Sequence, residues 1–300
     1  MTVKKTRIGL FLLITGSILV LTVWATLSGL PIKVLWDRNT SGKIAPYTLL
    51  HQSSSNLDQE IAFYQKRIKQ NPDGFLDLIE LAQIYLRRAK SSGEASWYLL
   101  AEQAASRSLA NFQNNPGALL ILARIAMARH DFQQALILTQ RVAGMQPSDL
   151  GIQSNYVTIY LSFGDVKRAA QDAEILVTRS PGLDSYMQRA LVRIAQGLES
   201  QAIGDFLHAI RLEQVGQMDG SAQVRALLGR LYARRTHLDW AEDLYQEALR
   251  ILPRNPFVLG LLADLKMRQQ RFEAADKNYE DAFLRSMAPI YLLGQARAKQ

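Results

Sequence analysis

Histidine, cysteine and closely spaced carboxylates are the side chains that most often hold metal ions or carry out catalysis. This sequence has no cysteine, which excludes disulfides, thiolate zinc sites and cysteine nucleophiles. Its four histidines lie far apart and lack the spacing of metal ligands: His51, His130, His208 and His237. The sequence therefore predicts no metal site.

One acidic cluster has the composition of a site for acid–base catalysis. Its members are Glu273, Asp276, Glu280 and Asp281. Lys277 lies among these carboxylates, so we interpret the cluster as the solvated face of a helix. The sequence also lacks a glycine-rich phosphate loop, an H-E-x-x-H motif and a G-x-S-x-G motif. These observations predict a protein that is not an enzyme, with no cofactor and no small-molecule substrate.

The elements that carry these residues repeat along the chain. Residues 150–183 contain two runs with apolar side chains at helical spacing, separated by Gly164-Asp165 and ended by Pro181. Each unit is therefore expected to form two short amphipathic helices joined by a tight turn. Matching residues recur 34 positions apart, in the pairs Asp131 and Asp165, Ala135 and Ala169, Pro147 and Pro181, Leu228 and Leu262, Ala241 and Ala275, Tyr245 and Tyr279, and Ala248 and Ala282.

This pattern resembles the tetratricopeptide repeat, a helix–turn–helix unit of about 34 residues. The resemblance is strongest in one unit that has, at the family spacing, Leu228-Gly229, Tyr232, Ala241, Tyr245, Ala248 and Pro253. It implies an all-α fold, a right-handed α-solenoid of about six repeats plus capping helices over residues 57–300. An irregular helical bundle is the alternative, and it is disfavoured because a bundle has no reason to keep a fixed period.

Two places depart from the regular repeat. In the first full unit, a loop at Lys90–Gly93 is expected to add residues between the helices, and Trp97 and Tyr98 follow it. These two aromatic residues either cover the base of the loop or form a contact site. The fourth unit lacks a closing proline, and Glu213–Gly220 form an insertion that could bend the superhelix or act as a hinge.

An apolar segment precedes the repeats. Residues 1–7 form a short basic tail, and residues 8–32 contain no charged side chain. We predict a transmembrane helix or signal anchor at residues 8–30, because about 20 helical residues span the roughly 30 Å of a bilayer core. A signal peptide cleaved near Ala25 is the alternative. The basic tail favours a cytoplasmic N-terminus and places the repeats on the extracytoplasmic side.

Residues 31–56 are expected to form a polar linker between this segment and the repeats. The net charge of +8 is concentrated near the N-terminus, because residues 1–50 hold six basic side chains and only one acid, Asp37. Basic side chains beside an apolar segment are typical of a contact with phospholipid head groups or of a signal that sets membrane topology, rather than of nucleic-acid binding. We therefore predict a membrane protein without a nucleic-acid partner.

In tetratricopeptide proteins the first helix of each pair lines a concave groove, and the resemblance implies which residues do so here. The groove would be apolar and methionine-bearing in its middle and arginine-rich at its flanks, which suits a peptide with apolar anchors and acidic ends. The alternative is that these arginines only solvate the helices. The implied groove residues are Arg87, Leu120, Arg124, Met127, Thr158, Leu161, Met187, Leu191, Ile194, Arg230, Arg234, Met267 and Arg268.

These features together predict a membrane-anchored scaffold or assembly factor that binds a partner polypeptide. Two alternatives stay open: a soluble exported repeat protein released by cleavage near Ala25, and a regulatory or recruiting subunit of a membrane enzyme complex.

Overall fold

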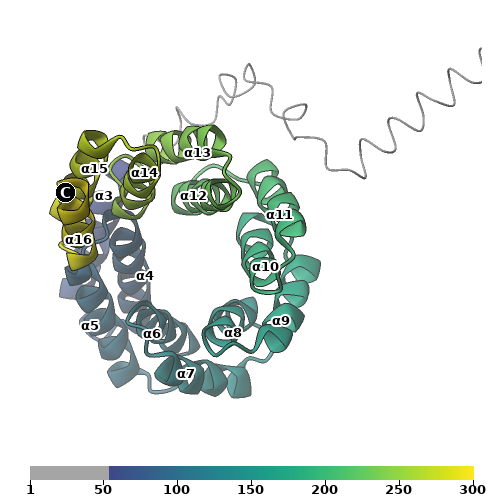
Figure 1. The fold of residues 1–300 in the computed structure, drawn as a ribbon. Coiled ribbons are helices and arrows are strands. Elements are labelled where there is room, and N and C mark those ends of the chain that lie inside the picture. The colour runs from purple at the N-terminus through teal and green to yellow at the C-terminus, as the bar shows by residue number, and fades with distance from the viewer. Residues whose placement is uncertain (1–53) are drawn as a thin grey trace, which may run out of the picture. The chain divides into compact units, whose positions relative to one another are not determined.

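The computed structural model describes residues 54–300, and every regular element in this range is an α-helix (Figure 1). The predicted transmembrane helix at residues 8–30 and nearly all of the predicted linker at residues 31–56 lie outside the described residues. Among the described helices, none combines the length and apolar character needed to cross a bilayer.

The helices form six consecutive pairs with single helices at both ends. This arrangement confirms the expected all-α fold of helical repeats. The N-terminal single helix is α3 (Ser54–Gln70), and the C-terminal one is α16 (Pro289–Ala298). The pairs are α4 (Phe75–Ser92) with α5 (Ala95–Asn111), α6 (Pro116–Ala128) with α7 (Phe132–Met145), α8 (Leu150–Ser162) with α9 (Val166–Arg179), α10 (Leu183–Ala195) with α11 (Glu199–Arg211), α12 (Met218–Arg234) with α13 (Leu238–Ile251), and α14 (Pro256–Arg268) with α15 (Phe272–Ser286).

Side-chain caps explain one of the recurring residues. Asp131 and Asp165 are the N-cap residues of α7 and α9, and each carboxylate accepts a backbone N–H bond, from Gln134 and Arg168 respectively, at 3.0 Å. Such a cap satisfies a backbone donor that has no partner inside the helix. The 34-residue spacing of these aspartates therefore marks where the second helix of a repeat begins.

The turn inside each of the last five pairs contains one residue in the left-handed conformation. Only two of these residues are glycine. The other three adopt a conformation that glycine favours, so the geometry of the turn outweighs their own backbone preference. Their φ angles are 61° at His130, 75° at Gly164, 77° at Gly197, 65° at Thr236 and 58° at Gln270.

Small residues allow the two helices of a pair to approach closely. An ideal Cβ at Gly229 would lie 2.6 Å from the ring of Tyr245 on the paired helix, so this position has no room for a side chain. The recurring alanines are fully buried: Ala135, Ala169, Ala241, Ala248, Ala275 and Ala282.

The loop predicted at Lys90–Gly93 is mostly helix, so that prediction was wrong in detail. The additional residues lengthen α4, which ends at Ser92, and α5, which begins at Ala95. Gly93 ends α4 with a φ of 76°, and its N–H donates to the carbonyl of Ala89. Trp97 packs 5.7 Å from the ring of Tyr85, which favours the covering role for this aromatic residue.

The insertion after α11 is held in place by a buried arginine. The Arg225 side chain on α12 is fully buried, and its guanidinium lies 2.7 Å from a carboxylate oxygen of Glu213 and 3.0 Å from one of Glu247. Because Glu213 begins the insertion and Glu247 lies on α13, this cluster ties the insertion to the fifth repeat. A clamped bend fits this arrangement better than a free hinge.

The repeats curve far enough for the first and last pairs to meet. Figure 1 shows α4, α6, α8, α10, α12 and α14 as the inner layer of a ring, with the second helix of each pair outside. Helix α4 contacts α12, and an ideal Cβ at Gly93 would lie 2.5 Å from Cγ of Pro256, at the start of α14. We call this junction of the first repeat with the fifth and sixth repeats the seam.

Candidate functional site

The residues expected to line a groove lie on the six inner helices. These helices form the inner layer of the ring (Figure 1), and we call their exposed and partly buried side chains the inner face. The structure places Arg87 on α4, Arg124 and Met127 on α6, Leu161 on α8, Met187 and Ile194 on α10, Arg230 and Arg234 on α12, and Arg268 on α14.

These residues differ in how much surface they offer. Most of the arginines are exposed, and most of the apolar residues are partly buried. Met187 and Leu120 are each only 8% exposed, so both mainly pack between neighbouring helices. The exposed residues are Arg87, Thr158, Arg230, Arg234 and Arg268, and the partly buried ones are Arg124, Met127, Leu161, Leu191, Ile194 and Met267.

Three of the exposed arginines also contact the protein itself. Arg87 forms an ion pair with Glu60 on α3. Arg234 lies 2.9 Å from the carboxylate of Glu199, at the start of α11. Arg268 donates a hydrogen bond of 2.6 Å to the carbonyl of Ala233, near the end of α12. These contacts join neighbouring repeats and hold the guanidinium groups in place.

Arg230 differs from these three arginines. Its side chain is exposed, and it forms no ion pair with any residue in the described range 54–300. A guanidinium of this kind can bind a carboxylate through two parallel hydrogen bonds. Arg230 is therefore the inner-face residue best suited to hold an acidic group of a partner.

A second group of charged residues on the inner helices comprises Lys90, Arg124, Asp184 and Asp219, which influence one another electrostatically. Desolvation and the nearby charge of Arg124 lower the pKa of Lys90, while Asp219 and Asp184 act in the opposite direction. Desolvation raises the pKa of Asp219, and Lys90 and Arg87 oppose that shift. The Lys90 side chain reaches solvent, yet protein surrounds it closely enough to perturb its charge. Helix α12 thus faces α4 through opposite charges at the seam.

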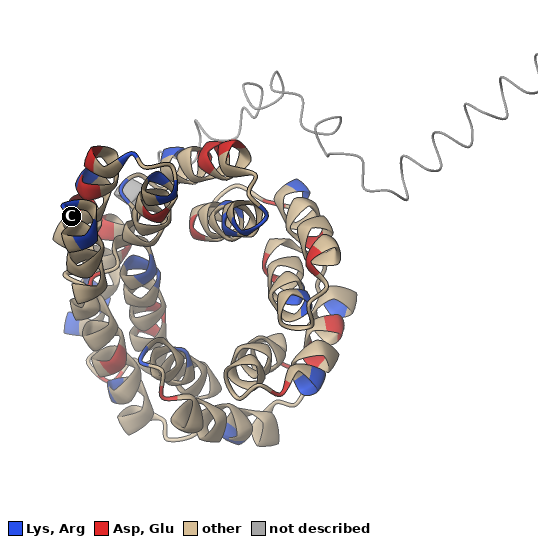
Figure 2. Ribbon diagram, in the orientation of Figure 1, with Lys and Arg blue, Asp and Glu red and all other residues tan. Residues whose placement is uncertain are grey.

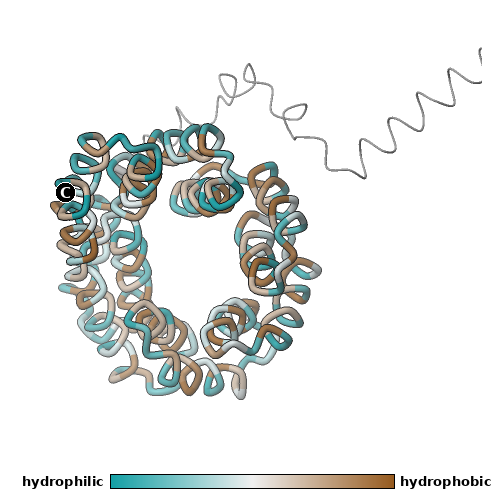
Figure 3. Tube along the Cα trace, in the orientation of Figure 1, coloured by the Kyte–Doolittle hydropathy of each residue, from teal (hydrophilic) through white to brown (hydrophobic). Residues whose placement is uncertain are grey.

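The inner helices differ in charge. Helix α8 carries no charged residue, and α6 carries one, Arg124. Figure 2 shows α8 almost entirely in tan, whereas α4, α12 and α14 carry blue segments. Brown stretches lie on α6 and α10 in Figure 3. The inner face therefore has an uncharged part and a basic part.

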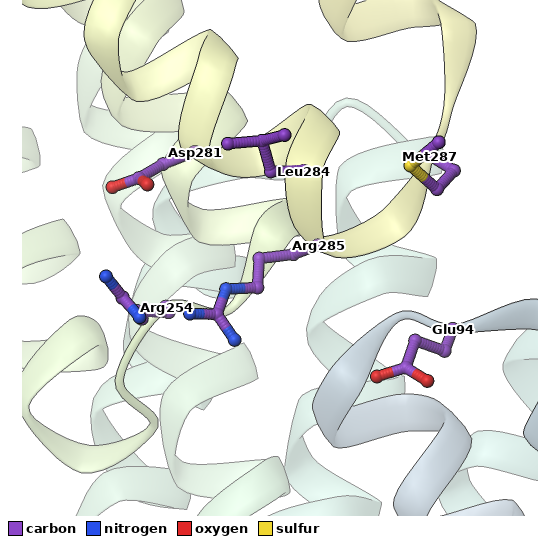
Figure 4. Close-up of a pocket in the computed structure, with 6 residues that line it drawn as sticks. All are labelled: Glu94, Arg254, Asp281, Leu284, Arg285 and Met287. Carbon is purple, nitrogen blue, oxygen red and sulfur yellow. The ribbon is translucent and has the colours of Figure 1, made fainter.

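A pocket of about 490 Å³ opens at the seam (Figure 4). It is bounded by Glu94 from the first repeat and by residues of the sixth repeat and the turn before it. Figure 4 shows the guanidinium of Arg285 between Arg254 and Glu94. The pocket confirms that the two ends of the repeat array lie side by side. Its lining residues are Glu94, Arg254, Asp281, Leu284, Arg285 and Met287.

The sequence analysis did not identify Lys90, Asp184 or Asp219 as inner-face residues. Lys90 was assigned to a loop and Asp219 to an insertion, whereas both lie in helices. Once α4 is known to continue, the spacing of Gln83, Arg87 and Lys90 places them on one helix face. That spacing is the signal that could have found Lys90.

The sequence matches no protein-family model and no curated protein. Solved structures do resemble the fold. A thermophilic tetratricopeptide repeat protein of Thermus thermophilus has a TM-score of 0.55 and 24% identity, over 62% of this chain and 99% of that one. A tetratricopeptide repeat protein of Parabacteroides merdae has a TM-score of 0.59 and 14% identity, over 85% and 99% of the two chains. A chain of the Cut9–Hcn1 hetero-tetramer of the APC/C has a TM-score of 0.63 and 16% identity, over 86% of this chain and 49% of that one.

The fold is a tetratricopeptide-like repeat array. This similarity, at low sequence identity, concerns the arrangement of helices. It agrees with the six helix pairs and with the turn and cap positions described above.

Proposed function

We propose that this chain is a non-catalytic scaffold that holds a partner polypeptide against the inner face of its repeats. The observation that carries the proposal is the set of exposed side chains on consecutive inner helices, with Arg230 available for an acidic group. Tetratricopeptide-like arrays commonly use their concave surfaces for binding. The Cut9–Hcn1 assembly is a complex of two different proteins, and one of its chains has this type of fold.

We further propose that residues 8–30 anchor the protein in a membrane, with the repeats on the extracytoplasmic side. The uncharged stretch at residues 8–32 and the basic tail before it support this arrangement. Anchoring would raise the effective concentration of the scaffold near membrane-bound partners, which makes weak contacts sufficient. N-terminal sequencing of the mature protein tests retention, because a new N-terminus near Ala25 would show cleavage and an exported soluble form.

A pull-down after crosslinking in intact cells tests the binding role. Full-length protein is compared with the double variant Arg230→Glu/Arg234→Glu, which reverses two charges on the inner face. The control is Arg107→Glu, because Arg107 is exposed on the outer helix α5. We expect one polypeptide to be lost from the inner-face variant and kept by the control. Retention of the same partners by both variants would contradict the proposal.

A further inference from the structure

Closure of the ring changes what the inner face can bind. In a linear groove, the arginines of α4 would lie at one end and those of α12 and α14 at the other. In the structure α4 contacts α12, and Gly93 at the end of α4 abuts Pro256 at the start of α14. The two basic flanks are therefore neighbours across the seam.

These three helices form what we call the basic wall. Eight basic residues lie on it, five of them exposed, against four acidic ones. Three of the acids are engaged within the protein. Asp77 forms an ion pair with Arg67, Asp219 lies near Lys90 and Arg87, and Asp264 accepts a hydrogen bond of 2.5 Å from the hydroxyl of Tyr279. The exposed basic residues are Arg87, Lys90, Arg230, Arg234 and Arg268, and the fourth acid is Glu80.

The other three inner helices, α6, α8 and α10, form what we call the uncharged wall. Its partly buried and exposed surface comes from Met127, Thr158, Leu161, Leu191 and Ile194. Four charged residues lie on these three helices. Arg189 and Arg193 form ion pairs with Asp205 on the outer helix α11. This leaves Arg124 and Asp184, whose charges are opposite. Desolvation lowers the pKa of Arg124, and Asp149 and Asp184 oppose that shift. Figure 1 places α8 on the far side of the ring from α14, so the two walls face each other.

We propose that the bound partner segment is two-faced along its length, with acidic side chains on one side and apolar side chains on the opposite side. This inference rests on the proposed function and replaces the expectation of a peptide with acidic ends. A carboxylate at the basic wall meets arginine forks, whereas a carboxylate at the uncharged wall loses hydration without gaining a partner. Side chains with apolar surface have the reverse preference.

Three synthetic peptides with the same composition of Glu, Leu and Ser test the proposal. The first segregated peptide places Glu and Leu at helical spacing, so that they lie on opposite faces of a helix. The second segregated peptide alternates Glu and Leu, so that they lie on opposite faces of a strand. The third peptide places Glu at both ends and Leu in the middle. Binding to the full-length protein in detergent is measured by fluorescence anisotropy. We expect at least one segregated peptide to bind tenfold or more tightly than the end-acidic peptide.

Two further readouts locate the peptide. A photoreactive group on its acidic side should crosslink to α4, α12 or α14, and one on its apolar side to α6, α8 or α10. Arg230→Glu should weaken the segregated peptide at least tenfold, whereas Arg107→Glu on the outside of the ring should leave it unchanged. Arg230→Lys should retain part of the affinity, because the charge is kept while the planar fork is lost.

The outcomes separate the two proposals. Equal or tighter binding of the end-acidic peptide overturns the two-faced partner and leaves the scaffold role standing. Failure of all three peptides to bind, together with a native partner that survives Arg230→Glu/Arg234→Glu, overturns both. Crosslinks of the acidic side to the uncharged wall also overturn the inference.

Discussion

Substitution of Gly93 by alanine tests whether the ring is closed in solution. Gly93 has a φ of 76°, and an ideal Cβ would lie 2.5 Å from Cγ of Pro256 and 3.5 Å from Cβ of Ser286. Pro256 is buried at the start of α14, and its side chain is a rigid pyrrolidine ring, so it has little freedom to move away. The added methyl group therefore either strains the seam or forces it open.

The expected magnitude follows from two terms. Placing alanine in the left-handed conformation costs about 1–2 kcal/mol, and overpacking a tight contact costs about 1–3 kcal/mol more. The matched control is Gly164→Ala, because Gly164 has almost the same φ, 75°, and nothing lies within 4 Å of its ideal Cβ. We expect a loss of about 1–2 kcal/mol for the control and about 2–5 kcal/mol for Gly93→Ala.

Two measurements separate strain from opening. Urea unfolding gives the stability of each variant. Spin labels on Ser96→Cys and Leu284→Cys report the distance across the seam pocket, and the chain has no cysteine of its own to be labelled. We expect the distance to lengthen or broaden in Gly93→Ala and to stay unchanged in Gly164→Ala. Identical stabilities and distances for the two variants would refute closure of the ring.

Three further predictions concern stability. Arg225→Met should lower the free energy of unfolding by about 3–5 kcal/mol in urea titrations, because its two carboxylate partners stay buried without a cation; a loss no larger than that of the exposed Arg107→Met would contradict this. Desolvation raises the pKa of Asp172 to about 6, so the folded state binds this proton more tightly than the unfolded chain. Stability should therefore fall as the pH rises from about 4 to about 6 and be flatter in Asp172→Asn; parallel pH curves would count against this assignment. Gly229→Ala should lower the free energy of unfolding by about 1–3 kcal/mol in urea titrations, because the added methyl group overpacks the contact with Tyr245. Gly144→Ala should cause no such loss, because nothing lies within 4 Å of its ideal Cβ.

The repeat fold could be predicted because its signals are local and periodic. Asp131 caps a helix within its own repeat, and the buried alanines mark helix contacts between near neighbours in sequence. Errors arose where one repeat departs from the pattern. Lys90–Ser92, assigned to a loop, continue α4 as a helix.

The arrangement of the candidate site could not be predicted in the same way. The sequence identified which helix each groove residue belongs to, and the structure places those helices in the inner layer. The contact between Gly93 and Pro256 depends instead on small rotations that accumulate over six repeats. No local pattern records that sum, so the basic flanks were assigned to opposite ends of a groove rather than to one wall.

Site-specific photocrosslinking in living cells tests the central claim most directly. A photoreactive amino acid is placed at Thr158, which is exposed on the inner helix α8, and separately at Gln140, which is exposed on the outer helix α7. The account predicts that Thr158 crosslinks to one polypeptide, that Gln140 does not, and that Arg230→Glu/Arg234→Glu abolishes the crosslink. Capture of the same polypeptide from Gln140, or its persistence in the double variant, would contradict binding at the inner face.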